Sequence, residues 1–384
     1  MSPDAKTATG DWGGRRSELA ERGITVSLFL NHQYQAVVKE GRDTNQGRSS
    51  ASVDFFLAAD LAKLELVPNA DVFLHLQSNW GAGVNPRTGA ILEVNDDADG
   101  DLGLHVAQLW YRHRFLERKL SLTLGFLDFQ TLVDRNAFAN SEDKQFMHQA
   151  LDNNPLVPLS IGLGAAILYQ PVSWYSVSLG AGDAQSVLYK PGFSTAFHED
   201  AYFFGYMENA LHPRWDTERG PLPGNYRAGV VYDPRFRAEF LDRRQTPRSE
   251  GDDYGAYAGF DQLVVREGPD DEQGLGVFGR FGYRTPQTNR FARFWSAGVQ
   301  YLGLIPGRDT DVLGFGVALD RGSRLNREFV NPRFDNETVY EAYYAIQITK
   351  WFVLTPDVQY VDNPGAAGGV GHAVVAAVRA RVSF

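Results

Sequence analysis

The sequence predicts an all-β protein, a transmembrane antiparallel β-barrel of about 16 strands with a short N-terminal helix and one loop folded inward. Three observations support this. Apolar and polar residues alternate in segments along most of the 384 residues. The connections between these segments are alternately short and long, and residues 128–158 interrupt the pattern. In such a barrel the apolar side chains face lipid, the polar ones face the lumen, and short turns and long loops lie at opposite ends.

The strands are predicted from alternation with a period of two. In residues 24–38 most even positions are apolar and most odd positions are polar, and residues 71–80 repeat the pattern. The same reading predicts strands at 24–38, 51–66, 71–80, 103–115, 119–127, 159–170, 174–183, 201–211, 225–240, 254–266, 274–284, 291–303, 311–320, 338–349, 351–362 and 372–384.

The connections favour a barrel that crosses a membrane. Tight connections follow the second, fourth, sixth, twelfth and fourteenth predicted strands, whereas most odd-numbered strands are followed by long polar segments. Alternation alone also fits a soluble β-sandwich, which buries one apolar face of each sheet. The long segments are 39–50, 81–102, 128–158, 184–200, 241–253 and 321–337.

The end of the chain distinguishes the two folds. Residues 372–384 form an amphipathic strand that ends at Phe384, which is typical of outer-membrane proteins. Aromatic side chains beside short turns also fit an interfacial girdle. These are Trp174, Tyr175, Trp351 and Phe352.

Composition excludes several classes of protein. The formal net charge of −10 argues against a nucleic-acid partner. The chain lacks a run of about 18 apolar residues, so no transmembrane helix is predicted. The absence of cysteine fits an oxidising compartment. The chain opens in polar sequence without a signal peptide, so an exported protein would be represented here by its mature form.

Two segments outside the strands have their own patterns. Residues 10–22 predict a short amphipathic helix ended by Gly23, so we divide the chain into an N-terminal segment, 1–23, and a barrel, 24–384. Within 128–158 we expect a helix capped by Asn140 or Ser141. Its apolar stripe would be Phe146, Met147, Ala150 and Leu151.

The length of residues 128–158 indicates a functional role, because loops this long without strands are uncommon in compact domains. We expect the loop to fold into the barrel and narrow its channel. The alternative is a surface lid on an ordinary sandwich.

Three motifs resemble a known family. Residues 10–15 read GDWGGR, residues 138–142 read FANSE, and residues 354–360 read LTPDVQY followed by Asn363 and Pro364. This set resembles the OprB family of carbohydrate-selective porins. The resemblance implies a sixteen-stranded barrel in the outer membrane of a Gram-negative bacterium, with a pore narrowed by a loop. It also implies passive uptake of mono- or oligosaccharides, contact with outer-membrane lipid, no cofactor, and a monomer in preference to a trimer.

A sugar site needs planar donors, carboxylate or amide acceptors, and aromatic faces. Strand parity places several polar residues on the lumen side near mid-height, and the loop adds others. The predicted constriction residues are Arg112, Arg280, Arg379, Asp60, His75, Gln77, Asp357 and Gln359 from strands, and Asp134, Asn136 and Glu142 from the loop.

Two other functions fit the sequence less well. Asn95, Asp97 and Asp99 resemble part of a calcium loop, but Val106 stands where the bidentate glutamate is required, so a solvated acidic loop is the stronger interpretation. The sequence contains neither G-x-S-x-G nor H-E-x-x-H, so we do not expect an enzyme. A general diffusion channel or a polysaccharide exporter remains the alternative within transport, and an outer-membrane hydrolase is the weaker alternative.

Overall fold

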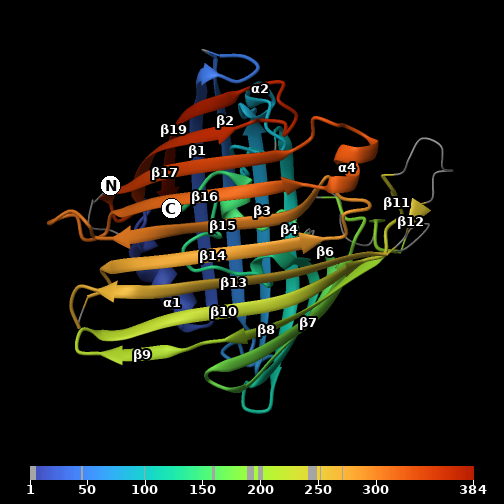
Figure 1. Ribbon diagram of the computed structural model, residues 1–384. Helices are drawn as coiled ribbons and strands as arrows, with labels where there is room; N and C mark the ends of the chain where they lie inside the picture. Colours follow the sequence, from blue (N-terminus) through green and yellow to red (C-terminus); the bar gives the residue numbers. More distant parts are fainter. Residues whose placement is uncertain are drawn as a thin grey trace.

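The computed structural model describes residues 6–44, 46–98, 100–157, 161–187, 194–197, 202–240, 249–250, 252–269 and 271–384. Its strands form one closed antiparallel barrel (Figure 1). Strand β1 (Ile24–Glu40) closes the ring, because it pairs with β2 (Gln46–Asp60) on one side and with β19 (His372–Ser383) on the other. Closure of this ring excludes the sandwich alternative.

The remaining wall strands follow in chain order. They are β3 (Ala70–Gly81), β4 (Leu102–Phe115), β5 (Leu120–Asp128), β6 (Ile161–Val172), β7 (Tyr175–Asp183), β8 (Phe203–Leu211), β9 (Arg214–Thr217), β10 (Gly220–Asp233), β13 (Asp253–Arg266), β14 (Gly274–Arg284), β15 (Phe291–Leu302), β16 (Val312–Gly322), β17 (Asn336–Thr349) and β18 (Phe352–Asp362). A separate hairpin is formed by β11 (Arg237–Ala238) and β12 (Ser249–Glu250).

The described wall has the predicted number of strands. The sheet contains 17 segments, but β8 and β9 both pair with β10 and are two halves of one strand. Counting them together gives sixteen. Two predicted strands are displaced. The strand predicted at 51–66 ends at Asp60, whose carboxylate accepts the N–H groups of Ala62 and Lys63 and starts a turn. The strand predicted at 225–240 is β10, which begins earlier because it continues into a hairpin with β9.

The helices are short. They are η1 (Trp12–Gly14), α1 (Arg15–Glu21), α2 (Asn85–Thr88), η2 (Phe129–Thr131), α3 (Gln149–Asp152) and α4 (Arg324–Phe329). None of the helices in the described parts of the chain is long and apolar enough to cross a membrane. The predicted N-terminal helix begins only at Arg15, because Gly13 and Gly14 take left-handed backbone conformations, and Gly23 (φ 97°) follows its end.

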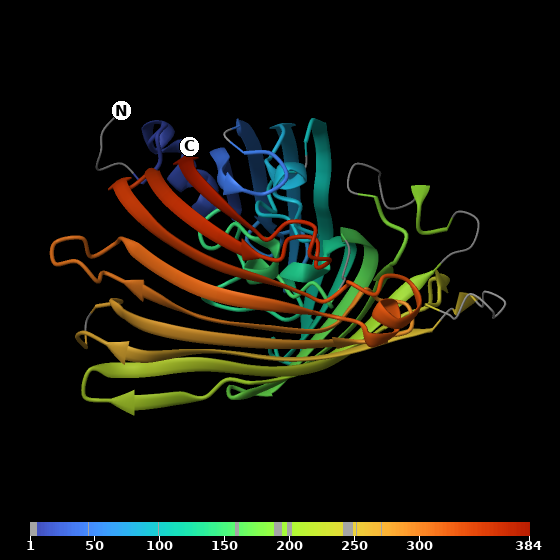
Figure 2. The ribbon, with the colours of Figure 1, turned by 45° about the horizontal axis from the view of Figure 1, so that its top comes forward.

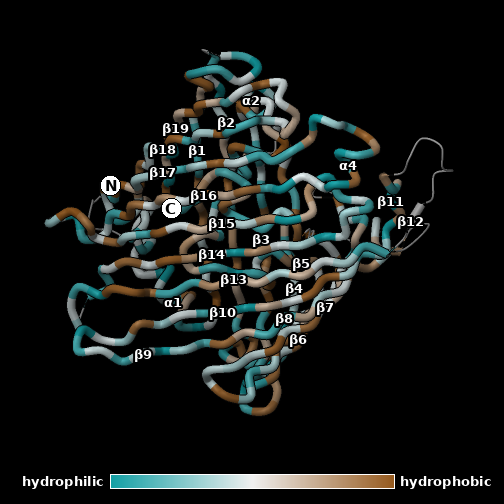
Figure 3. The backbone as a smooth tube through the Cα atoms, in the orientation of Figure 1, coloured by the Kyte–Doolittle hydropathy of each residue, from teal (hydrophilic) through white to brown (hydrophobic). Residues whose placement is uncertain are grey.

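Hydrophilic and hydrophobic residues alternate along the strands of the wall (Figure 3). Val230, Phe315 and Val378 are 54%, 49% and 44% exposed on the outside of the ring. Exposed apolar side chains repeated around a closed barrel require an apolar surrounding. The inner side is polar, so the alternation divides a lipid-facing surface from a lumen.

The two ends of the chain meet at one end of the barrel (Figure 1). The N–H of Ala8 donates to the carbonyl of Ser383 (2.7 Å), and Arg16 donates to the carbonyl of Phe384 (2.9 Å). The N-terminal segment is therefore fastened to the last strand.

Candidate functional site

The described part of the connection between β5 and β6, residues 129–157, lies inside the ring of strands (Figure 2, green). Its polar contacts come from lumen-facing positions on β8, β14, β17 and β19. We call this segment the inner loop.

Arg280 of β14 is one anchor of the inner loop and is only 4% exposed. Its guanidinium donates to the carbonyl oxygens of Leu151 (3.0 Å), Asp152 (3.1 Å) and Ala139. Its Nε lies 3.6 Å from the carboxylate of Asp134. One planar cation therefore binds carbonyl oxygens from two distant parts of the inner loop and fixes the distance between these two parts.

Arg379 of β19 is the second anchor and is also buried. It donates to the carbonyl oxygens of Glu142 and Gln145, the latter at 3.0 Å. Arg381 follows two positions later on the same strand, and it pairs with the carboxylate of Asp143 at 2.9 Å. Both arginines of β19 therefore hold the middle of the inner loop.

The predicted helix beginning at Asn140 or Ser141 is wrong. The helix α3 is a single turn that begins only after His148. The carboxylate of Glu341 on β17 accepts the N–H groups of Met147 and His148, and Arg379 takes carbonyls before them. The backbone thus finds its hydrogen-bond partners on the wall instead of in a helix.

The predicted apolar stripe of the loop packs on the wall. The ring of Phe146 lies edge-on to Phe278 (5.6 Å between centroids) and Tyr343 (5.0 Å). Gly316 allows this approach, since a Cβ there would lie 2.8 Å from the side chain of Leu151. The fully buried stripe is Phe146, Met147, Ala150 and Leu151. Because the loop packs against β14–β19, the open lumen lies along β1–β5.

Two cavities occupy that side. The first, about 590 Å³, we call the acidic cavity, and the second, about 520 Å³, we call the arginine cavity. They share lining residues on β2, β4 and the inner loop, so they are consecutive sections of one passage. The acidic cavity has the acidic residues Asp54, Glu93, Asp96, Asp97, Asp128, Glu142, Asp143 and Asp152 and the basic residues His75, Lys144 and Arg381. The arginine cavity contains Arg112 and Arg135.

A row of aromatic rings follows the wall of the passage across four neighbouring strands. Successive ring centroids lie 5.8, 5.9 and 4.9 Å apart. The row consists of Phe29, Phe56, Phe73 and Trp110 on β1, β2, β3 and β4. All four line one or both cavities.

A guanidinium group stands at each end of the aromatic row. The Cζ of Arg381 lies 4.1 Å from the ring centroid of Phe29, and the Cζ of Arg112 lies 4.5 Å from that of Trp110. Arg112 also donates to the hydroxyl of Thr123 (3.0 Å). Flat apolar faces next to planar donors are the arrangement that a sugar ring requires, because its C–H face is apolar and its rim is hydroxylated.

Comparison with known proteins agrees with this architecture. The family described as "Carbohydrate-selective porin, OprB family" matches residues 44–384. The chain belongs to this family. It is therefore a carbohydrate-selective porin of the Gram-negative outer membrane, a channel and not an enzyme, which confirms the predicted fold, function and location.

Similar proteins cover the whole chain. Porin B of Pseudomonas aeruginosa is 24% identical over 100% of this chain and 92% of its own. The putative porin QuiX of Acinetobacter baylyi is 20% identical over 100% of this chain and 94% of its own. A high-pH structure of Pseudomonas putida OprB matches with a TM-score of 0.89 and 22% identity, covering 100% of this chain and 99% of the other. The last similarity supports the fold.

Some predicted site residues of this porin line the passage. His75, Gln77 and Glu142 line the acidic cavity, and Arg112 and Asn136 line the arginine cavity. His75 also stacks on the aromatic row.

The other predicted residues lie elsewhere. The amide of Gln359 donates to the carbonyl of Val94 (2.9 Å), in the connection between β3 and β4, and to the carboxylate of Asp357 on its own strand. Asp60 lies in the turn described above. The predicted residues that do not line either cavity are Arg280, Arg379, Asp134, Asp357, Gln359 and Asp60. Strand parity identifies the inward side of each strand, but it does not show which inward residues the loop covers.

Parity could also have found the aromatic row, which the sequence analysis missed. Phe29, Phe56, Phe73 and Trp110 are aromatic residues on the polar side of their strands. That position is unusual in itself, because lumen sides are mostly polar. Parity shows that each ring faces the lumen, whereas the register shows that the four rings lie side by side.

Asp97, from the segment that resembles a calcium loop, is hydrogen-bonded to the barrel wall. The carboxylate of Asp97 accepts hydrogen bonds from Gln33 (2.6 Å) and Ser52 (3.0 Å), and Asn95 accepts the N–H of Asp97. Asp99 lies outside the described residues. Burial raises the pKa of Asp97 to about 8. In the described chain, no group of three acidic or histidine side chains could hold a metal ion.

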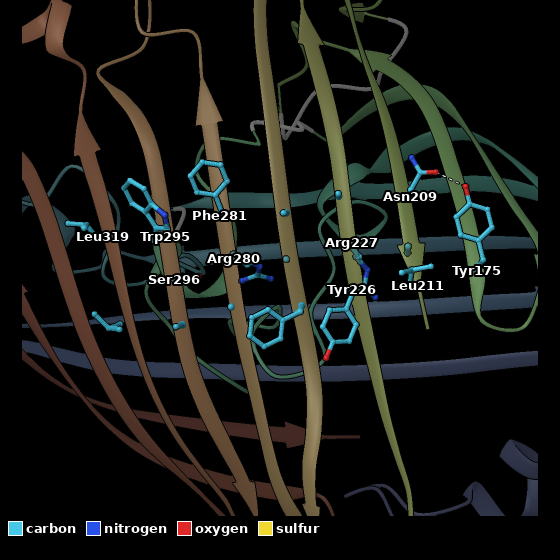
Figure 4. Close-up of a pocket in the computed structure, with 18 residues that line it drawn as sticks. Tyr175, Asn209, Leu211, Tyr226, Arg227, Arg280, Phe281, Trp295, Ser296 and Leu319 are labelled. Atoms are coloured by element: carbon cyan, nitrogen blue, oxygen red, sulfur yellow. Dashed lines mark hydrogen bonds between the residues drawn. The ribbon is translucent and has the colours of Figure 1, made fainter. Parts of the chain in front are cut away.

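A third hollow, about 880 Å³, is separate from the passage (Figure 4). Phe281, Trp295 and Leu319 border it from the outer side of their strands, and its lining is almost wholly apolar. The hydroxyl of Tyr175 donates to Asn209 (2.6 Å) at its edge. This hollow belongs to the lipid-facing surface.

Proposed function

We propose that this porin selects sugars at the aromatic row and its two flanking guanidinium groups, and that residues 128–158 form the constriction. The observation that carries the proposal is the row Phe29, Phe56, Phe73 and Trp110 along the open side of the lumen. A general diffusion channel has no need of a continuous apolar strip in its narrow section. Mono- and short oligosaccharides can move along such a strip while their hydroxyls exchange partners with polar neighbours.

We assign the predicted site residues to two roles. Arg112, His75, Gln77, Asn136 and Glu142 contact the passing sugar. Asp134, Arg280, Arg379, Asp357 and Gln359 position the loops that shape the passage. Asp60 is left out of the site, because it caps a turn at the other end of its strand.

The test is sugar block of single-channel current. Trp110→Ala removes one ring of the row, and an aromatic contact contributes about 1 kcal/mol, so the half-blocking glucose concentration should rise roughly fivefold. Phe315→Ala, on the outer wall, is the matched control. Equal block by glucose and by a neutral amino acid of similar size would favour the general diffusion channel.

We further propose that one chain forms the channel alone, in contact with outer-membrane lipid. The passage, its anchors and its aromatic row are complete within one chain, so permeation needs no second chain, and the monomer is the state that the family resemblance implies. Light scattering in detergent that gives the mass of three chains would contradict this.

A further inference from the structure

The acidic cavity contains more carboxyl groups than basic groups. Eight acidic side chains line it against one lysine, one arginine and one histidine. Arg381 is occupied by Asp143 (2.9 Å), and His75 is occupied by Asp54 (2.8 Å). The remaining carboxyl groups face a passage through which solutes must move.

Two of these carboxyl groups lie on the inner loop and are held in place by the anchors. The carbonyl of Glu142 is bound by Arg379, and the carbonyl of Asp152 by Arg280. Burial, and then the charge of Asp152, raise the pKa of Glu142. Arg379 and Arg280 therefore bind the backbone of Glu142 and Asp152. The side-chain carboxyl groups of Glu142 and Asp152 lie close to each other at the cavity.

Two buried acceptor atoms of the cavity have no donor in the described part of the chain. The Oδ1 atoms of Asp152 and Asn31 are both unpartnered, and their residues are only 1% and 2% exposed. Both residues line the acidic cavity from opposite sides, the inner loop and β1. Buried acceptors without donors in the chain need a donor from water or from a ligand.

We propose that the acidic cavity selects saccharides that carry a protonated amine, the amino sugars, over neutral and acidic sugars of the same size. The inference rests on the proposed sugar permeation and adds the charge of the substrate. An ammonium group offers three donors and no acceptor, which suits Glu142, Asp152 and Asn31. The sugar ring can lie against Phe29 and Phe56, which line the same cavity.

The charge pattern favours an organic cation. No three acidic or histidine side chains within the described residues are arranged to hold a metal ion. An acidic sugar would bring its carboxylate toward like charges, which is unfavourable at short range. An N-acetylated sugar keeps the ring and the nitrogen of an amino sugar but is larger by an acetyl group and has no positive charge, whereas glucose is close to glucosamine in size and is neutral, so the two together separate charge from size.

The experiment compares glucosamine, N-acetylglucosamine, glucose and glucuronate as blockers of single-channel current at constant pH and salt. We expect glucosamine to half-block at a concentration about tenfold lower than N-acetylglucosamine, since one hydrogen bond to a charged group contributes about that factor. Glucuronate should be the weakest blocker. The variants Glu142→Gln and Asp152→Asn, which keep the side-chain shapes, should each reduce the ratio between the half-blocking concentrations of N-acetylglucosamine and glucosamine. Asp216→Asn, at an exposed position on β9, is the matched control.

Block by glucose together with equal block by glucosamine and N-acetylglucosamine would overturn this inference but not the proposed function. Failure of every sugar to block better than a neutral amino acid would overturn the proposed function. The wild-type protein alone decides both questions, so the inference stays testable even where a variant does not fold. A folded double variant that carries both Glu142→Gln and Asp152→Asn and keeps the full preference for glucosamine would also contradict the inference.

Discussion

The role of Arg280 as an anchor can be tested by Arg280→Ala. The substitution leaves the carbonyls of Leu151, Asp152 and Ala139 without their donor and the carboxylate of Asp134 without its cation. Removing one partner of a buried ion pair costs about 3–5 kcal/mol. Each 1.4 kcal/mol is a factor of ten, so the population with an undocked loop should rise roughly a hundredfold or more.

The barrel should persist, because its strands pair independently of this side chain. The assay is single-channel conductance in planar bilayers, with the half-blocking glucose concentration measured in the same records. We expect higher conductance, more current noise and weaker block. Arg293→Ala, on the outer side of β15, is the control. Wild-type conductance and block in folded Arg280→Ala would refute the anchoring role.

Three other predictions follow from named contacts. Arg112→Ala should weaken glucose block about threefold to tenfold and shift ion preference toward cations, because a charged donor and a positive charge leave the passage; unchanged block would show that Arg112 does not contact the sugar. Raising the pH through about 8 should increase cation preference, because Asp97 then ionises. The unfolded pKa of an aspartate is about 3.9, so the folded protein should also lose stability as the pH rises from about 4 to about 8, and Asp97→Asn should remove both effects as measured by reversal potential and thermal unfolding. Arg16→Ala should lower the temperature of the heat-dependent gel shift without altering conductance, since Arg16 holds the carbonyl of Phe384; an altered conductance would place the N-terminal segment in the permeation path.

The site was predictable only in part. Parity placed His75, Gln77 and Arg112 on the lumen side, and all three line the passage. The same rule placed Arg280 and Arg379 on that side, yet both are covered by the inner loop and bind its carbonyls. A pattern with a period of two reports the direction of a side chain and contains no information on what packs above it.

The sequence by itself determined the barrel, because lipid on one side and water on the other impose an alternation that each strand carries locally. It also determined that the inner loop would have an apolar stripe, since Phe146, Met147, Ala150 and Leu151 are buried as their pattern indicates. Only the tertiary structure decided the form of the loop and the position of the passage. The loop's backbone groups are satisfied by Arg280, Glu341 and Arg379, residues more than a hundred positions away in the chain. Contacts over such separations depend on closure of the ring, which brings β14, β17 and β19 around a segment that no local pattern assigns to them.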